Sequence, residues 1–279
     1  MTRTVHIVEP AGSGGVYQHA ASLAAALARE GVPVVFHTAA AAEEGPADAV
    51  PRHPCFWHFR GVRPRPVRRA AVAAGWLGAG VPSCLARFRR GDVVHVEGWF
   101  RPPLLLPLVV GAKARGCLVA LSPHTTFNRR GRRGNEWLMR RMARTADVVF
   151  AFSAPDRRRV EGWGVPAVQV PMVLDPPRPS ADLVDGWRRR WRADGERRIV
   201  LFAGQIRPDK GLDLLVRAAA GWPDHVVLAV VGEDLGALAP ALRLAKDLGV
   251  SPHVDEGYQP IERFVAALAA ADVVACPYR

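Results

Sequence analysis

The 279-residue chain has 49% hydrophobic and 23% charged residues, the composition of a globular protein with room for two domains. Its four cysteines, Cys55, Cys84, Cys117 and Cys276, are far apart in sequence and show no paired spacing, which argues against a disulfide framework and for a reducing compartment. No apolar run is long enough to span a bilayer, and the N-terminus opens directly on a strand pattern instead of a cleavable signal, so we expect a cytoplasmic protein.

The net charge of +12 comes from one half of the chain. Residues 1–150 hold 21 Lys and Arg against 9 Asp and Glu, whereas residues 151–279 hold 17 of each kind. Such one-sided charge favours an anionic partner, and an anionic membrane surface would place the protein on the inner face of the membrane. The alternative is an Arg-rich composition that only keeps the surface soluble. We expect no nucleic-acid partner, because no zinc finger, RNP-like strand or regular aromatic interleaving occurs.

Strand and helix patterns alternate along the first half. A strand at residues 4–9 precedes a helix at 16–30, and further strands are expected at 32–38, 92–99, 117–124, 147–153 and 167–172. After the Pro-rich segment DPPRPSADL, a second series has strands at 197–204, 225–233, 253–258 and 272–276, with helices up to Lys246 and over 261–270. Alternation of this kind predicts parallel sheets with helices on both faces. The fold class is therefore α/β, with two Rossmann-like doubly wound domains at 1–175 and 197–279 and a linker at 176–196. The second domain is expected to be incomplete, because nothing follows its last strand.

A glycine-rich loop, GSGGVYQHA, connects the first strand to the first helix. Glycines there let the backbone approach a phosphate or a sugar beside free N–H groups of the helix. The dinucleotide pattern G-x-G-x-x-G is not met, because Tyr17 stands where the third glycine would be. The second strand also ends without an acidic residue, which argues against NAD. A tight turn that needs glycine is the alternative.

The segment FAGQIRPDKGLDLLVRAAA is the most specific stretch. A strand ends at Gly204, a short loop carries Arg207 and Lys210, and Gly211 opens a helix. Two cations at the carboxyl edge of a parallel sheet, beside a helix start, suit a diphosphate. A Walker loop is excluded, because G-x-x-x-x-G-K-[ST] does not occur. The alternative is a solvated surface loop.

Six segments, taken in this order, resemble the retaining glycosyltransferases of family 4, which have the GT-B fold. They are GSGGVYQHAASLAAALAREGVPVVFHT, HTTF, TADVVFAFSAPDRRRVEGWGVP, GQIRPDKGLDLLVRAAA, VVGE and AADVVACPYR. The resemblance implies transfer of a sugar from a nucleotide-sugar donor to a glycan or lipid-linked acceptor, with no metal and no covalent cofactor. It also implies that the N-terminal domain holds the acceptor and the C-terminal domain the nucleotide.

The resemblance assigns roles to residues of this chain. Arg207 and Lys210 would neutralise the departing diphosphate, and His124 would lie beside the transferred sugar. The remaining donor-binding residues implied are Gly14, Gly15, Gly204, Gly232, Gln259 and Ile261. One departure affects Arg207: the commoner family loop has arginine directly after the glycine, where this chain has Gln205.

In the family, the strand that matches DVVACPYR is followed by a loop and a helix with two glutamates, which this sequence does not contain. We therefore expect residues 1–279 to be a fragment that binds donor weakly and turns over little or not at all. We expect its last strand, lacking a covering helix, to expose apolar surface. The alternative from another class is a non-catalytic module that binds nucleotides or polyanions.

Four further features are open to two interpretations each. His53, Cys55 and His58 lie close together, but no second ligand cluster accompanies them, so no metal is expected. Glu97 is either an acceptor-side base or, by preference, a plain loop carboxylate. Residues 70–86, with Trp76, are either a helix pair on the sheet or a membrane-interface segment. The basic stretch 128–137 is either a cationic loop over the cleft or a solvated one.

Overall fold

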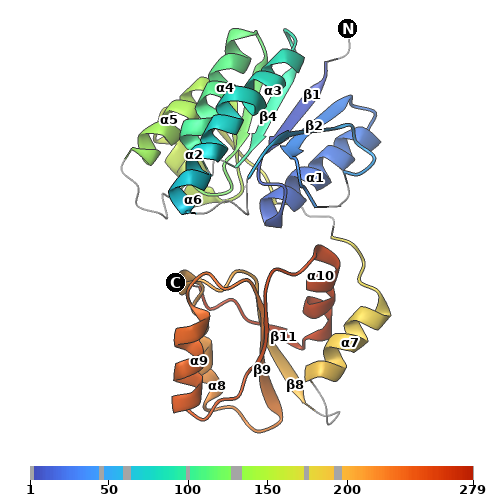
Figure 1. Ribbon diagram of the computed structural model, residues 1–279, viewed down its shortest axis with the longest axis vertical. Helices are drawn as coiled ribbons and strands as arrows, with labels where there is room; N and C mark the ends of the chain where they lie inside the picture. The colour runs from blue at the N-terminus through green and yellow to red at the C-terminus, as the bar shows by residue number, and fades with distance from the viewer. Residues whose placement is uncertain are drawn as a thin grey trace. The chain divides into compact units, whose positions relative to one another are not determined.

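The computed structural model describes residues 3–43, 47–58, 64–98, 101–126, 134–172, 176–191 and 197–278. The chain divides into two units, Met1–Asp175 and Pro176–Arg279, and each is a parallel sheet with helices on both faces (Figure 1). The predicted α/β class with Rossmann-like doubly wound units is therefore confirmed. No helix in the described part of the chain is long and apolar enough to cross a membrane.

The first unit contains a seven-stranded sheet of order β3-β2-β1-β4-β5-β6-β7, in which all pairs are parallel. The strands are β1 (Val5–Glu9), β2 (Val34–Ala39), β3 (Arg52–Phe56), β4 (Val93–Glu97), β5 (Leu118–Ser122), β6 (Val148–Ala151) and β7 (Ala167–Gln169). The chain winds outward from β1 to β3 and then returns to the other side of β1. The strand order therefore reverses between β1 and β4.

The sequence patterns missed β3. Its sequence, RHPCF, contains proline and histidine instead of an alternating β-branched pattern. Proline is tolerated because β3 is the edge strand of the sheet, where one side of the backbone needs no partner.

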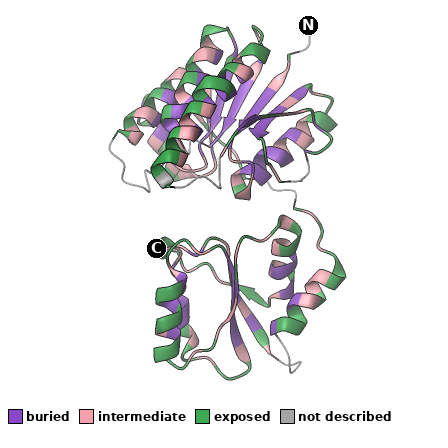
Figure 2. Cartoon of the chain, in the orientation of Figure 1, coloured by how far each residue is buried: buried purple, intermediate pink, exposed green. Residues whose placement is uncertain are grey.

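Helices cover both faces of this sheet. On one face lies α1 (Gly14–Arg29), whose Tyr17 and alanines pack on Ile7 and Phe36. The other face is covered by α2 (Arg65–Gly75), the π-helical turn η1 (Trp76–Gly80), α3 (Val81–Arg87), α4 (Pro102–Ala114), α5 (Asn135–Thr145) and residues of α6 (Ala154–Glu161). Figure 2 shows the resulting pattern, with buried strands between helices whose outer faces are exposed.

The segment with Trp76 packs into the protein interior. The Trp76 ring is 1% exposed and meets the Phe56 ring edge-on at 5.0 Å between centroids. This supports the helix-pair interpretation of residues 70–86 over the membrane-interface one.

On the opposite face, α1 leaves an apolar groove of about 410 Å³ open beside it. Leu23 and Leu27 of α1 line one side of the groove, and Leu118, Val148 and Phe150 of β5 and β6 line the other.

The second unit contains a four-stranded parallel sheet of order β10-β9-β8-β11. Its strands are β8 (Arg198–Ala203), β9 (Val226–Gly232), β10 (His253–Glu256) and β11 (Val273–Val274). One face is covered by α7 (Ala181–Trp191) and α10 (Ile261–Ala270), which are packed together, and the other by α8 (Leu212–Ala219) and α9 (Leu238–Asp247) (Figure 1). A short 3₁₀ turn, η2 (Pro208–Lys210), precedes α8.

The strand β11 is shorter than predicted. The sequence predicts a strand over 272–276, whereas β11 has two residues; among the described residues it pairs with β8, and Val273 and Val274 are 53% and 44% exposed. The expected exposure of apolar surface is confirmed. An uncharged run does not distinguish a central strand from an edge strand, because burial depends on what packs against it.

Candidate functional site

Two buried carboxylates lie where the first sheet reverses its strand order. Glu9 ends β1 and Glu97 ends β4, and both side chains are fully buried. Because β1 and β4 are parallel neighbours, their carboxyl ends meet at one edge of the sheet. In open α/β sheets this reversal point is where ligands bind.

Glu9 is held by the glycine loop. Its carboxylate accepts hydrogen bonds from the backbone N–H of Ala11 at 3.0 Å and of Gly12 at 2.8 Å. Burial raises the pKa of Glu9 to about 7, with a smaller contribution from the charge of Glu97. A buried carboxyl with its pKa raised in this way keeps its proton to a higher pH than an ordinary glutamate does.

Glu97 lies among three histidines. Its Oε2 is 2.7 Å from Nε2 of His124 and 3.4 Å from Nδ1 of His19, and its Oε1 is 3.3 Å from Nε2 of His95. Burial alone would raise the pKa of Glu97, but the contacts with His124 and His19 and the charge of His95 lower it to about 2. Glu97 is thus an ionised, buried carboxylate, and the preferred interpretation as a plain loop residue was wrong. The available signal was an acidic residue at the end of a buried strand beside the reversal point.

His124 is fixed on several sides. It is the one non-glycine residue with positive φ (55°) that the structure describes, and its ring lies 4.7 Å from that of Phe152 and 5.0 Å from that of His19. Together with the bond to Glu97, these contacts set the direction of the imidazole. A residue held in this backbone region typically belongs to a site whose surroundings fix it.

The glycines of the first loop have different roles. A Cβ on Gly12 would lie 2.5 Å from the Cβ of Ala39, so this glycine is required for packing against β2. In contrast, a Cβ on Gly14 or Gly15 would meet nothing within 4 Å, so the start of α1 is open around them. Gly14 and Gly15, and not Gly12, therefore leave room for a ligand to approach the backbone.

The second unit brings its predicted glycines together at the carboxyl edge of its sheet. A Cβ on Gly232 would lie 1.8 Å from the carbonyl oxygen of Gly204, which follows β8. The N–H of Gly257 then donates to Gly232 O at 2.9 Å. Gln259 and Ile261 follow β10 at this same edge and are half-buried. The close backbone approach explains Gly232 without any ligand.

The Lys210 loop (residues 205–211) follows β8, at the point where the strand order of the second sheet reverses between β8 and β11. Arg207 makes a bidentate ion pair with Asp209, with Nε to Oδ1 at 2.9 Å and Nη2 to Oδ2 at 2.7 Å. Nζ of Lys210 stands 3.6 Å from the centre of the Tyr278 ring, a cation–π contact. The hydrogen bond and charge of Arg207 hold the pKa of Asp209 below its usual value.

Asp209 was not singled out from the sequence, and it changes the electrostatics of this loop. The Asp209 carboxylate pairs with Arg207 and offsets its charge. Lys210 is not paired with Asp209 in this way, and its ammonium group faces the Tyr278 ring instead. Asp234 occupies the N–H groups at the start of α9. It accepts hydrogen bonds from the N–H groups of Gly236, Ala237 and Leu238, so this helix start is already capped.

The histidines and cysteine of HPCFWH separate in the structure. His58 bonds to the carbonyl of Pro10 at 2.7 Å, whereas His53 and Cys55 face His37 of β2 and Cys84 of α3. The sequence analysis missed this second pair because His37 and Cys84 are brought in by strand pairing and helix packing. Of the basic stretch 128–137, residues 128–133 lie outside the described residues.

Comparison with protein families matches both units. The family described as Glycosyltransferase Family 4 matches residues 13–174, and the one described as Glycosyl transferases group 1 matches residues 184–279. The chain belongs to glycosyltransferase family 4. The resemblance stated from the sequence motifs is thereby confirmed, and the matches together extend over nearly the whole chain.

Two curated relatives show the range of similar proteins. A D-inositol 3-phosphate glycosyltransferase of Mycolicibacterium gilvum is 38% identical over 118 residues, covering 38% of this chain and 27% of that protein. A GDP-mannose-dependent alpha-(1-6)-phosphatidylinositol monomannoside mannosyltransferase of Mycolicibacterium smegmatis is 35% identical over 151 residues, covering 50% of this chain and 39% of that protein. This chain thus matches well under half the length of these two relatives.

Solved structures share the fold. HepE of Anabaena, in complex with UDP and glucose, superimposes with a TM-score of 0.71 at 15% identity, covering 98% of this chain and 74% of that one. The catalytic domain of starch synthase IV from Arabidopsis thaliana, bound to ADP and acarbose, gives a TM-score of 0.68 at 13% identity, covering 99% and 78%.

Proposed function

We propose that this chain belongs to an enzyme that transfers a sugar from a nucleotide-sugar donor to a phosphate-bearing acceptor. The observation that carries the proposal is the Lys210 loop, which lies at the reversal point of the second sheet in a chain matched to glycosyltransferase families over both units. The neighbours HepE and starch synthase IV, which hold UDP and ADP, support a nucleoside diphosphate as the group bound there.

In this proposal the donor diphosphate is bound by the second unit. Negative charge grows on the diphosphate as its bond to the sugar breaks, and Lys210 stabilises that charge. Arg207 contributes once its guanidinium turns from Asp209 to the phosphate, because the same guanidinium donors cannot bind the Asp209 carboxylate and the phosphate at once. Gly204, Gly232, Gln259 and Ile261 form the surrounding edge, where the base and ribose would lie. The reaction, as proposed, needs no metal and no covalent cofactor.

The first unit would bind the acceptor and the transferred sugar. His124 offers its ring beside the sugar, and the ionised Glu97 keeps that ring in place. Gly14 and Gly15 leave room for a ligand beside the start of α1.

A phosphorylated acceptor fits the charge of this half. Residues 1–150 carry the whole +12 excess, and the two curated relatives are named for acceptors that contain inositol and phosphate. A lipid-linked acceptor of this kind would bring the protein to the surface of a membrane as a peripheral protein.

Calorimetry with UDP-, GDP- and ADP-sugars, followed by a nucleotide-release assay with inositol 3-phosphate and lipid-linked inositol acceptors, tests the proposal. Lys210→Ala should weaken binding of the preferred nucleotide about tenfold or more, since a charge-assisted contact is worth roughly 1.5–3 kcal/mol. Lys246→Ala, at the exposed end of α9, is the matched control and should bind like the wild type.

Turnover in this assay that is lost in Lys210→Ala supports the proposed enzyme and excludes a non-catalytic nucleotide-binding module. Binding that depends on Lys210 without any turnover is expected both of the module and of residues 1–279 as a fragment of the enzyme. Failure to bind any nucleotide sugar contradicts both.

A further inference from the structure

Four side chains with metal-binding atoms converge inside the first unit. They are His37 of β2, His53 and Cys55 of β3, and Cys84 of α3, and their ligand atoms all lie within 4.8 Å of one another. His37 and Cys84 are fully buried, Cys55 is 1% exposed, and His53 is half-buried. The two sulfurs are 3.4 Å apart, and Nδ1 of His37 is 2.9 Å from Nδ1 of His53.

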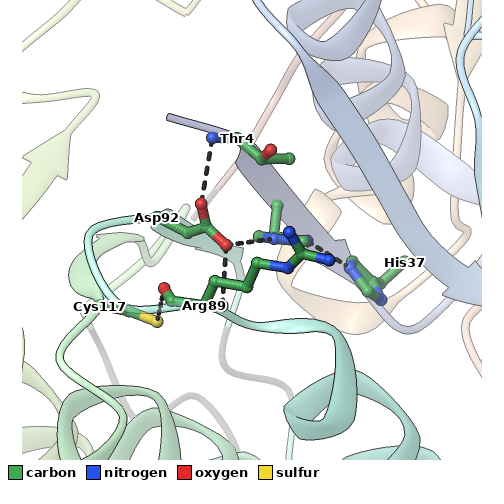
Figure 3. A network of polar contacts seen from close by, with 6 residues as sticks. Thr4, His37, Arg89, Asp92 and Cys117 are labelled. Carbon is green, nitrogen blue, oxygen red and sulfur yellow. Dashed lines mark hydrogen bonds and ion pairs between the residues drawn. The ribbon is translucent and has the colours of Figure 1, made fainter. Parts of the chain in front are cut away.

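A chain of hydrogen bonds orients His37 toward this cluster. Asp92 accepts from the backbone N–H of Thr4 and of Arg89, and its Oδ2 also lies 3.2 Å from Nε2 of His6 (Figure 3). Since a carboxylate only accepts, Nε2 of His6 is the donor. In a neutral ring Nδ1 of His6 is then the acceptor, and it receives the N–H of His37 Nε2 at 3.0 Å.

This arrangement leaves the lone pair of His37 Nδ1 directed at the cluster. In protein metal sites, a ligating histidine donates its other N–H to a carboxylate or a similar partner, which fixes the tautomer and the ring orientation. Asp92 and His6 supply such support from outside the four candidate ligands. On the far side, Nε2 of His53 lies 2.9 Å from Oγ of Ser83, which can accept a hydrogen bond from the N–H of that ring.

The surroundings suit a metal held by two thiolates. Phe88 packs its ring against His6 at 4.8 Å and against His37 at 5.6 Å, which excludes water from that side. Arg87 is close enough to act electrostatically on His37, His53 and Cys84. A divalent ion bound by two thiolates and two neutral imidazoles has no net charge, so the guanidinium does not oppose it.

We propose that His37, His53, Cys55 and Cys84 form a closed, structural Zn²⁺ site of the Cys₂His₂ type. Zinc in such sites is tetrahedral, with bonds of about 2.3 Å to sulfur and about 2.0 Å to nitrogen, which separates the sulfurs by about 3.8 Å and the nitrogens by about 3.3 Å. The cluster reaches this geometry if the sulfur pair and the nitrogen pair each open by roughly half an ångström and the sulfur-to-nitrogen distances, which are at most 4.8 Å, settle at about 3.5 Å. With four protein ligands there is no position for a substrate, so the ion is structural.

The site would attach an edge strand and a helix to the sheet. It joins β2, β3 and α3. The edge strand β3 has a sequence, with proline and histidine, that favours strand formation only weakly. Metal binding of this kind adds directly to folding free energy, because the unfolded chain does not present the four ligands together. The inference does not depend on the proposed sugar transfer.

The test is the metal content of the full chain, purified without chelators from cells grown with zinc. Mass spectrometry should find about one zinc per chain. After removal of zinc, addition of Co²⁺ should produce the intense sulfur-to-cobalt absorption and the visible bands of a tetrahedral thiolate site. Chelation should also lower the melting temperature of the wild type by at least about 5 °C.

Variants test whether the zinc and the sulfur-to-cobalt absorption depend on these residues. The double variant Cys55→Ser/Cys84→Ser should lose the zinc and the cobalt–sulfur band. Cys117→Ser is the matched control, because Cys117 is also buried but bonds to the carbonyl of Arg89, and it should keep both signals. If the double variant does not fold, His53→Gln at the half-buried edge should weaken zinc retention at least tenfold against a chelator.

Two results would overturn the proposal. One is a wild-type chain that takes up Co²⁺ without any sulfur-to-cobalt band. The other is a Cys55–Cys84 disulfide in protein purified under anaerobic, reducing conditions, because oxidised sulfurs cannot bind the ion.

Discussion

Replacement of Glu9 by glutamine should remove a pH dependence from the stability of the first unit. The carboxylate is fully buried, and its pKa is about 7 instead of 4.5, chiefly because burial disfavours its charge. A folded-state pKa above the unfolded one means that folding favours the protonated acid. The stability from this group is therefore complete below about pH 4.5 and is lost as the pH rises through about 7.

The magnitude follows from the size of the shift. A difference of about 2.5 pKa units corresponds to about 3 kcal/mol, since one unit is 1.36 kcal/mol. Most of this, roughly 2–3 kcal/mol, is lost between pH 5 and pH 8, because part of the titration precedes pH 5. Glutamine has the same shape and keeps an oxygen to accept from Gly12, but it cannot ionise.

Urea unfolding at pH 5 and pH 8, followed by tryptophan fluorescence, measures this difference. The wild type should lose roughly 2–3 kcal/mol more than Glu9→Gln over this interval. Glu30→Gln, at the exposed end of α1, is the control for loss of one carboxylate and should follow the wild type. An equal loss in Glu9→Gln and the wild type would refute the assignment of a raised pKa to Glu9.

Three further predictions concern other positions. Glu97 has a pKa of about 2 in the folded state, so its stabilisation of the protein is complete above about pH 4.5 and is lost as the pH falls through 2. In acid-unfolding curves, Glu97→Gln should reduce this acid-induced loss of unfolding free energy by about 3 kcal/mol. If the proposed function holds, Asp209→Asn should release Arg207 and tighten nucleoside diphosphate binding about three- to tenfold in low salt, measured by calorimetry, and unchanged affinity would contradict the role of the ion pair. Gly232→Ala should prevent folding of the second unit, because the new Cβ would lie 1.8 Å from a backbone oxygen, whereas Gly186→Ala, where a Cβ meets nothing within 4 Å, should stabilise α7 by about 0.5–1 kcal/mol in thermal melts.

Much of the fold follows from local patterns. The alternation of apolar strands with Ala- and Leu-rich helices predicted parallel sheets in both halves, since each pattern is a property of five to fifteen neighbouring residues. Two strands depart from these patterns. The strand β3 contains proline and histidine and was missed, and β11 has two residues where the apolar run predicted a strand over 272–276.

The candidate site was predictable only in part. The motifs singled out His124, Arg207 and Lys210, whose residue types and positions after strands suit phosphate and sugar chemistry. For Glu97 the sequence left two interpretations and preferred the plain loop carboxylate, because a carboxylate in VEGW has the same local sequence whether it is solvated or buried among histidines. Asp209 stands two residues from Arg207, yet only the folded loop shows the two side chains paired.

The sequence by itself determined the class of this protein, because most of the elements, the two α/β units and the family 4 motifs each depend on a contiguous segment of the chain. The tertiary structure alone decided which side chains act together. Glu9 meets Glu97 because β1 pairs with β4, and His37 meets Cys84 because α3 packs beside β2 and β3. The physical reason is that burial and proximity set the pKa of Glu9 and the ligand set around Cys55, and both depend on contacts between segments that are distant in the chain.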